Sequence, residues 1–482
     1  MSLNAAFNGA LSGLQAFGKL SETISSNVAN AATPGYAQRS VSLSSNEIGG
    51  GVGVVGVMRN GDPAVVATRR SAEAQFASAD LVATFQSQLL QGIGTPDNPA
   101  SLSARYAAFE ASLMEAASAP NAPARLDAVV FAAKDLASVI NRSAAAISDA
   151  RTTADKAIVK DVELLNQSLR DVASLNTQIT LSRSRGVDTA SLIDQRQLAI
   201  DAINTIVPVR EVSRPNGQVA LISEGGAVLL DGTPAEVTFS AATTVTPYQS
   251  LDAGTLSGLM LNDLPVSMQG GNSALRGGTL AAQFAIRDDL APAAQVELDA
   301  VARNLIDRLQ APSVDPTLSP TSAGLFTDGG DRFDAVDELG ISNRLSVNPR
   351  VDPSAGGEIW RLRTGVDAAA PGPVGDARVL TSMRDALSET RTGLSGTLTQ
   401  ASSYQGLVSN LASWAGSQST RADARLSFTS ASYTEAQSVE LSRGIDTDAE
   451  LQNLLVVENA YAANARVLQV VDEMLDVLLG LG

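Results

Sequence analysis

Apolar residues recur in alternating steps of four and three over the first 33 residues of the chain. This spacing returns an apolar side chain to one face of a helix every 3.5 residues on average, as in the seam of a coiled coil. The seam of this predicted helix includes Leu3, Phe7, Leu14, Phe17, Ile24 and Val28. Thr33-Pro34-Gly35 should end the helix, because proline disfavours helical geometry at the residue before it.

Residues 446–482 carry the same spacing in two rows. One row consists of Leu454, Tyr461, Leu468 and Leu475, and the other of Val457, Asn464, Val471 and Leu478. Asp446 is a suitable N-cap, and Asp448 and Glu450 favour the positive end of the helix dipole. A long helix with one apolar stripe cannot bury that stripe alone. We therefore expect the first and last helices to pair as a coiled coil.

Helical periodicity dominates the chain between the two termini. A seam from Ile158 to Ile179 predicts a helix that runs to about residue 183, and a second helix over residues 189–207 should return antiparallel to it. Further helices are expected over residues 63–91, from residue 102, and over 277–310 and 402–443. Short strands are expected at residues 40–44, 49–57, 344–347 and 358–362.

Residues 209–272 differ from the rest because turn dipeptides separate short apolar runs. Asn216-Gly217, Gly225-Gly226 and Asp231-Gly232 indicate hairpins, since glycine accepts the positive φ that such turns require. The predicted fold class is therefore mainly α with β insertions. The expected parts are paired terminal helices forming a coiled-coil inner domain (1–37 and 446–482), a helical-bundle body with short strands (38–207 and 273–445), and an inserted small β domain (208–272).

Composition narrows the classes of partner. The 482-residue chain has a formal net charge of −17, which disfavours nucleic acid and anionic membrane because their phosphates would repel it. No uninterrupted apolar run approaches the roughly 18 residues that a membrane span needs. The first residues lack the basic start and continuous apolar run of a secretory signal, so we expect any export to use another route.

Cysteine and histidine are both absent from the sequence. Their absence excludes thiol nucleophiles, Cys/His zinc sites and histidine-based triads, so we expect no enzyme and assign no catalytic, cofactor-binding or metal-binding residues. Gly51–Gly56 matches GxGxxG but lacks the strand–helix context of a dinucleotide site. Asp328, Asp331 and Asp334 are spaced like Ca²⁺ ligands. The complete ligand pattern with its terminal glutamate is missing, which favours a solvated acidic turn.

Two segments near the chain ends resemble a known family. The matching residues of the first segment are Ser26, Asn27, Asn30, Thr33, Pro34, Gly35 and Tyr36, and those of the second include Tyr461 and Asn464. Both segments resemble the terminal signatures of bacterial flagellar rod, hook and hook-associated proteins. Gly50–Val54, together with Arg59 and Asp62, is similar to the same family.

The middle of the chain resembles one branch of that family. Asp194, Gln195 and Arg196, in the run Leu192–Arg196, look like a hallmark of the hook-associated proteins at the first hook–filament junction. Hook and distal-rod proteins share the terminal signatures but lack so long a helical body. Ala37-Gln38-Arg39 departs from the pattern, because the family tends to place its basic residue earlier.

The resemblance implies a structural junction protein rather than an enzyme. It implies export through the flagellar type III secretion route and assembly of copies of this chain into a ring between hook and filament, hence an extracellular location. The implied partners are the hook protein, the second hook–filament junction protein and an export chaperone that binds the C-terminal helix, with no nucleic acid or membrane. A distal rod or hook-type subunit is the alternative within the family. A carboxylate-dependent hydrolase in the variable middle is a remote alternative.

Overall fold

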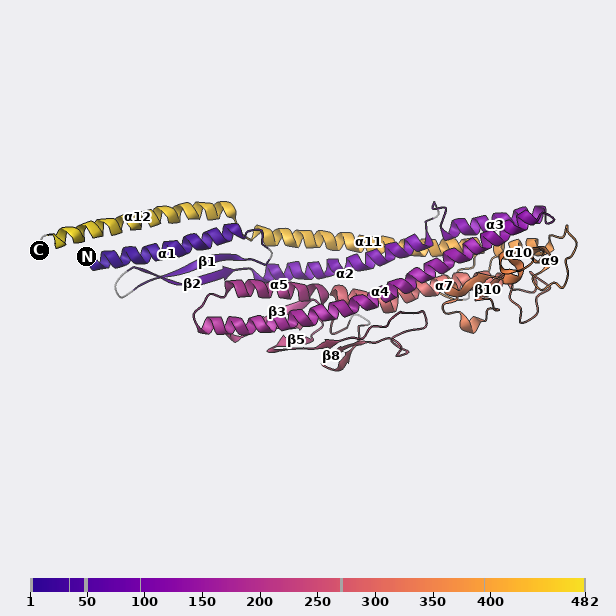
Figure 1. Cartoon of the computed structure of the whole chain (residues 1–482), viewed down its shortest axis with the longest axis horizontal. Coiled ribbons are helices and arrows are strands. Elements are labelled where there is room, and N and C mark those ends of the chain that lie inside the picture. Colours follow the sequence, from indigo (N-terminus) through magenta and orange to yellow (C-terminus); the bar gives the residue numbers. More distant parts are fainter. Residues whose placement is uncertain are drawn as a thin grey trace.

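The first and last helices of the chain lie together at one end of an elongated molecule (Figure 1). The computed structural model describes residues 3–33, 35–46, 51–95, 97–268, 272–393 and 395–480. The terminal helices α1 (Leu3–Ala29) and α12 (Thr447–Leu479) pack against each other. The predicted pairing of the two chain termini is therefore confirmed.

Helix α1 ends four residues earlier than the sequence pattern predicts. Residues 30–33 form a turn in which the Thr33 amide donates to the Asn30 carbonyl at 2.9 Å. The side-chain amide of Asn30 also donates to the Ser26 carbonyl at 2.9 Å. These bonds satisfy backbone groups that another helical turn would otherwise have satisfied, so the chain leaves the helix before it reaches the proline.

Long antiparallel helices build the body of the molecule. They are α2 (Pro63–Ile93), α3 (Leu102–Ser118), α4 (Pro123–Ser184), α5 (Ala190–Ile206), α6 (Gly278–Ala285), α7 (Ala291–Leu309), α10 (Arg378–Ser388) and α11 (Tyr404–Ser442). At 62 residues, α4 is about 90 Å long and runs the length of the body (Figure 1). The predicted α4–α5 hairpin is confirmed.

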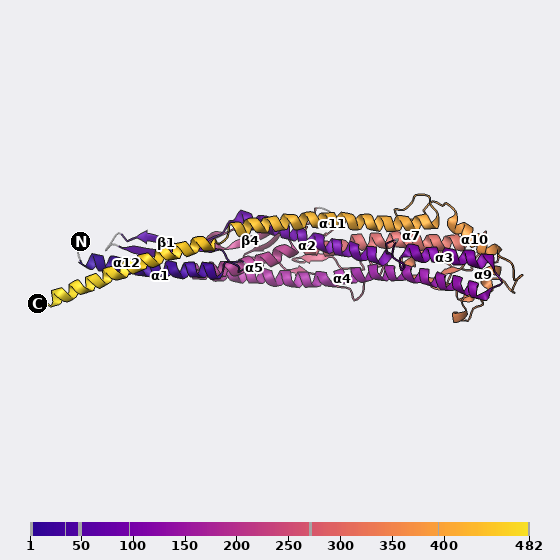
Figure 2. The same ribbon diagram turned by 90° about the horizontal axis from the view of Figure 1, so that it is seen from above.

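Helices α2 and α11 form an antiparallel pair that continues the direction of the terminal pair. They lie side by side in both views (Figure 1 and Figure 2). From Ala415 onward, the buried positions of α11 are all small: Ala415, Ser419, Ala422, Thr429 and Ala436. Small side chains let two helix backbones approach closely, so α2 and α11 pack tightly along this part of the body.

Short antiparallel strands are inserted between the helices. The hairpin β1 (Gln38–Ser45)–β2 (Val52–Asn60) packs on α1. A four-stranded sheet is formed by β3 (Val209–Ser213), β4 (Val219–Ser223), β5 (Val228–Asp231) and β6 (Thr233–Pro234). A three-stranded sheet is formed by β7 (Val237–Thr238), β8 (Leu259–Leu261) and β9 (Leu264–Val266), and β10 (Phe326–Asp328) pairs with β11 (Leu345–Val347).

The segment between α7 and α10 contains a wrong prediction. Residues 358–362 were expected to form a strand, but they form a turn and the short helix α9 (Arg361–Thr364). The Arg361 guanidinium donates to the carbonyls of Val366 and Ala368 and so closes the chain into a loop. The other expected strand is confirmed only from Leu345 onward, because the short helix α8 (Ile341–Arg344) precedes it.

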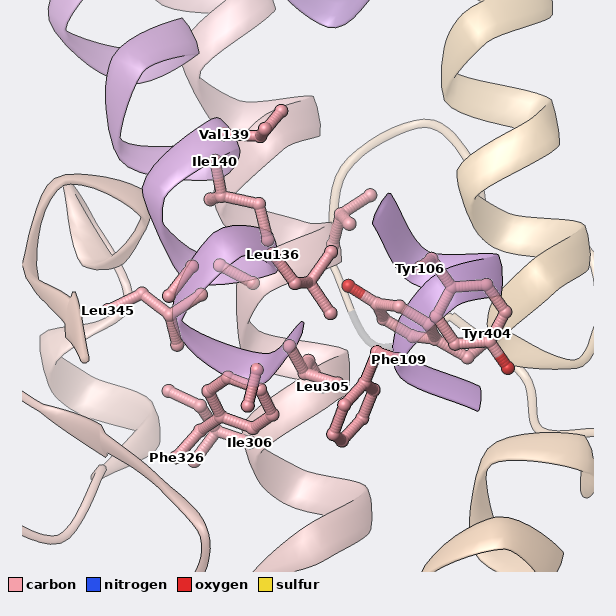
Figure 3. Close-up of a cluster of buried hydrophobic side chains, with 14 of the residues drawn as sticks. Tyr106, Phe109, Leu136, Val139, Ile140, Leu305, Ile306, Phe326, Leu345 and Tyr404 are labelled. Atoms are coloured by element: carbon pink, nitrogen blue, oxygen red, sulfur yellow. The ribbon is translucent and has the colours of Figure 1, made fainter. Parts of the chain in front are cut away.

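The largest hydrophobic core lies at the end of the body far from the terminal helices (Figure 1), and Figure 3 shows part of it. It gathers buried side chains from α3, α4, α7, α11 and the β10–β11 ribbon: Tyr106, Phe109, Leu136, Ile140, Leu305, Ile306, Phe326, Leu345 and Tyr404. The rings of Tyr106 and Tyr404 are 5.0 Å apart between centroids. These aromatic rings pack where α3, α11 and the β10–β11 ribbon meet.

A buried charge cluster joins the β insertion to the helices. Arg287 lies in a π-helical turn (Ile286–Leu290), and its guanidinium donates to Asp155 at 2.6 Å and to Asp288 at 2.8 Å. All three side chains are at most 5% exposed. Burial alone would lower the pKa of Arg287, but the bonds to the two carboxylates raise it above its ordinary value.

We predict that Arg287→Met destabilises the body by about 3 kcal/mol or more, because it leaves two buried carboxylates without their cation. Urea denaturation followed by circular dichroism measures the change. Arg378→Ala is the matched control. It removes an ion pair with Asp376 in which the arginine side chain is 88% exposed, so we expect no measurable change in stability. Equal effects of the two substitutions would contradict the prediction.

Candidate functional site: the terminal helices and their joint with the body

The buried face of the terminal helix pair is narrow and made largely of small or polar residues. On α1 the buried residues are Ala10, Gly13, Ala16, Thr23, Ile24 and Asn27, and on α12 they are Glu450, Val457 and Val471. We call α1, the β1–β2 hairpin and α12 the terminal arm. Since small side chains bury little apolar area, the arm holds together with less hydrophobic burial than the body has.

The structure distributes the predicted seam residues over three environments. Ile24, Val457 and Val471 are buried; Leu14, Phe17, Val28, Leu454 and Leu468 are half-buried; Phe7, Tyr461 and Leu475 are exposed. The side chains of Leu3 and Leu478 lie outside the described residues. Much of the predicted apolar stripe therefore faces solvent in the single chain.

The side chain of Asn27 joins three segments of the arm. Its amide group donates to the Arg39 carbonyl at 2.8 Å and to the Glu450 carboxylate at 2.9 Å. Its carbonyl oxygen accepts the Arg39 amide at 2.9 Å and the Tyr36 hydroxyl at 3.0 Å. Gln38 donates to the same Glu450 oxygen at 2.8 Å. Four hydrogen bonds on one buried side chain thus fix α1, β1 and α12 relative to one another.

The other N-terminal signature residues support this arrangement. The Ser26 and Tyr36 hydroxyls are 3.2 Å apart, and the Thr33 hydroxyl donates to the Asn30 side chain at 3.2 Å. Gly35 has φ +77°, and a Cβ there would lie 2.8 Å from Leu198 of α5. Glycine is required at this point because the turn touches the body with a backbone conformation that other residues rarely adopt. Pro34 lies outside the described residues.

Asp194 connects the arm to the body. It lies on α5 and accepts Arg39 at 2.8 Å and Arg59 at 2.8 Å, so that one carboxylate holds both strands of the β1–β2 hairpin. All three side chains are between 12% and 18% exposed. We call the contacts of Asn27, Arg39, Arg59, Asp194 and Glu450 the joint. It is the place where the terminal arm meets the body.

The two residues that follow Asp194 have different roles. Gln195 is exposed to solvent. Arg196 is buried, and it donates to the Asn176 side chain at 2.9 Å and to the Gly217 carbonyl at 2.7 Å. Burial lowers the pKa of Arg196, and the neighbouring arginines lower it further. Glu211 opposes them by raising it. Arg196 therefore links α5 to α4 and to the β insertion rather than to the arm.

A second ionic network lies beside the joint and was not predicted from the sequence. Arg69 of α2 donates to Glu440 of α11 at 2.8 Å and to Asp201 of α5 at 2.9 Å. Burial opposes its charge, but Asp201 and Glu440 raise its pKa above the ordinary value. Arg443 binds Asp62 at 2.6 Å, at the point where α11 gives way to α12. The adjacent arginines at the start of α2 were the available signal, yet Asp201 and Glu440 lie more than 130 positions from Arg69.

Three family models match consecutive parts of this chain. The model described as flagellar hook-associated protein FlgK helical domain matches residues 88–311. The models of the flagella basal body rod protein and of the flagellar basal body rod FlgEFG protein C-terminal match residues 7–36 and 437–481. Residues 88–311 therefore belong to the FlgK helical-domain family, and the two ends of the chain to flagellar rod-protein families. Membership of these structural flagellar families confirms the expectation of a non-enzymatic protein.

Known relatives of the FlgK family agree with this assignment. The chain is 24% identical to flagellar hook-associated protein 1 of Escherichia coli (strain K12) over 99% of its own length and 100% of that protein. It is 25% identical to the protein of that name from Salmonella typhimurium and from Salmonella typhi, over 48% of this chain and 44% of those proteins. In these two alignments the match spans less than half of the relative.

A solved structure of the flagellar hook junction protein FlgK from Burkholderia pseudomallei is 22% identical. The match covers 55% of this chain and 47% of the solved chain, with a TM-score of 0.43.

The acidic residues considered as metal ligands do not come together. Asp328 forms a two-pronged ion pair with Arg344, at 2.6 and 2.9 Å. Within the described ranges, no three or more Asp or Glu side chains form a group that could hold a metal ion. None of the described helices is long and apolar enough to cross a membrane.

We predict that Asp194→Ala loosens the terminal arm, because it leaves Arg39 and Arg59 without their shared carboxylate. A lost hydrogen bond to a charged group costs about 1.5–3 kcal/mol, so tryptic cleavage at Arg443 should become at least tenfold faster. Mass spectrometry of the early fragments measures the rate. Asp231→Ala is the control: it removes an exposed pair with Arg214 in the β insertion and should leave cleavage unchanged. An unchanged rate for Asp194→Ala would contradict the prediction.

Proposed function

We propose that this chain is the structural junction subunit that forms a ring between the hook and the filament of the bacterial flagellum. The observation that carries the proposal is the outer face of α12, which is apolar and exposed. Its exposed apolar residues are Leu451, Leu455, Val456, Val467, Val470, Met474 and Val477. Large exposed apolar surfaces on soluble proteins are typical of protein–protein interfaces.

The β1–β2 hairpin extends the apolar surface of the terminal arm. Val54, Val55 and Met58 of β2 are exposed, as are Phe7 and Leu11 of α1. An arm that buries a narrow face internally and presents apolar residues outward suits a subunit that packs among copies of itself. In the ring, neighbouring arms would cover these residues, and the hook protein and the second junction protein would contact the ring from its two sides.

The C-terminal helix also suits the proposed export chaperone. Residues 446–482 contain seven acidic residues and one basic residue, Arg466, which gives a net charge of −6. A helical groove binds such an amphipathic segment through apolar anchors three and four residues apart. Because Leu454 and Leu468 contact solvent as well as α1, a chaperone and α1 would compete for one face of α12. The chain would be exported through the flagellar secretion route and act outside the cell.

A distal rod or hook subunit is the second candidate. Its support is the match of the two terminal segments to rod-protein models. The match of residues 88–311 to the hook-associated helical domain favours the junction subunit. A deletion strain distinguishes the two candidates. Loss of the junction subunit should leave complete hooks that carry no filament and release flagellin, whereas loss of a rod or hook subunit should leave no complete hook.

We predict that Val456→Asp abolishes filament growth in the deletion strain while the purified monomer keeps its thermal unfolding temperature. The side chain is 67% exposed in the single chain, so a charge there disturbs only the proposed interface. Gln452→Glu, one turn earlier on the same helix and also exposed, adds the same charge at a polar position and should restore motility. Swimming in soft agar and electron microscopy of the hooks measure both.

The proposal would fail if Val456→Asp supported normal filaments, since the outer face of α12 would then be uncovered in the assembled flagellum. Failure of both variants would show that the helix tolerates no added charge, and would remove the outer face as evidence for a ring interface.

A further inference from the structure

The apolar residues of the terminal pair do not define how far α12 is shifted along α1. Their spacing repeats every seven residues on both helices, so sliding one helix by seven residues again places apolar residues opposite apolar residues. Such a slip would also change which residues face the hairpin and the body. Something other than the apolar seam must therefore select the observed register.

The first polar contact across the pair is that of Asn27 with Glu450. Both side chains are at most 4% exposed, and they are joined at 2.9 Å. Among the described residues, no arginine or lysine pairs with Glu450; its carboxylate is held by the amides of Asn27 and Gln38. A buried carboxylate is tolerated only where such donors meet it.

The second contact across the pair is that of Gly13 with Asn464. A Cβ at Gly13 would lie only 3.0–3.1 Å from the side-chain atoms of Asn464. The Asn464 amide donates to the Ala460 carbonyl of its own helix at 3.1 Å, so its hydrogen bonding does not depend on α1. The contact is one of shape: α1 has a glycine where α12 has its amide group.

The two contacts agree on one alignment. Asn27 and Gly13 are two heptads apart on α1, and Glu450 and Asn464 are two heptads apart in the opposite sense on α12. The same alignment places Leu20 opposite Val457. A slip of one heptad in one direction would place Glu450 opposite Leu20, and in the other direction Asn27 opposite Val457. Either slip buries a polar group against a hydrocarbon side chain.

We propose that Asn27–Glu450 and Gly13–Asn464 set the register of the terminal helix pair, and that the apolar seam supplies attraction without selecting the register. A polar residue at one seam position is known to fix alignment in coiled coils, at a cost in stability. The inference concerns the folded chain itself, so it can fail or hold independently of the proposed ring.

The test uses disulfide trapping in the full-length chain, which contains no native cysteine. Ala16→Cys with Tyr461→Cys reports the observed register, because both positions lie three residues from the Gly13–Asn464 contact. Ala16→Cys with Leu454→Cys and Ala16→Cys with Leu468→Cys report the two slipped registers. When no residue other than these is changed, oxidation should trap the Ala16→Cys/Tyr461→Cys pair ~10-fold or more faster than either slipped pair.

The decisive background is Asn27→Leu/Glu450→Leu/Asn464→Leu, in which the polar side chains of both contacts are replaced by leucine. We expect a slipped pair to be trapped within about threefold of the native pair there. Glu450→Gln alone keeps an acceptor for Asn27 and should retain only the native pair. If the slipped pairs stay silent in the triple variant while the native pair forms, the apolar seam sets the register and the proposal is overturned. Loss of all three disulfides would also overturn it, because the polar residues would then be needed for pairing itself.

Discussion

The contact between α1 and α12 is the constraint on which the rest of the chain depends. It brings the first and last helices together, and so every other element must fold within a loop whose two ends are fixed side by side. Asn27 carries this contact at the point nearest the body, where a single amide binds α12 and the backbone of β1. Arg39 and Arg59 of the hairpin bind Asp194 of α5. These two ion pairs fix the orientation of the arm relative to α5. Local order at the chain ends thus depends on residues more than 400 positions apart.

Buried arginines connect distant elements throughout the molecule. Arg308 of α7 donates to the carbonyls of Ala386, Glu389 and Ser402. Among the described residues no carboxylate bonds to it, and burial lowers its pKa. Arg151 binds the carbonyls of Thr246, Gln249 and Arg287 in the same way. A guanidinium has five donors in a fixed plane, so one side chain satisfies several chain ends at once. In a chain without cysteine, these multiple bonds hold loops that disulfides hold in many extracellular proteins.

The sequence predicts most of the helices because their spacing is a local property. The pairing of the termini followed from two apolar stripes, and the α4–α5 hairpin from a seam interrupted by one turn. The joint could not be predicted in the same way. The bonds of Asn27 to Glu450 and of Arg39 to Asp194 depend on which faces meet in space, and a polar residue on a helix gives no sign of a partner hundreds of positions away. Residues 358–362 were mistaken for a strand because the loop closure by Arg361 is likewise non-local.

The weakness of the arm and its capacity for assembly have the same origin. The buried face of α1 consists mostly of alanine, glycine and threonine, where the distal core has tyrosine, phenylalanine and leucine, so the arm gains less from internal burial. Several apolar residues of α12 face outward instead, among them Val456, Val470 and Val477. Exchanging these with the small inner residues would stabilise the single chain and remove the surface that a neighbour could cover. Because an apolar side chain can be buried only once, stability withheld from the monomer is available to the proposed contact between subunits.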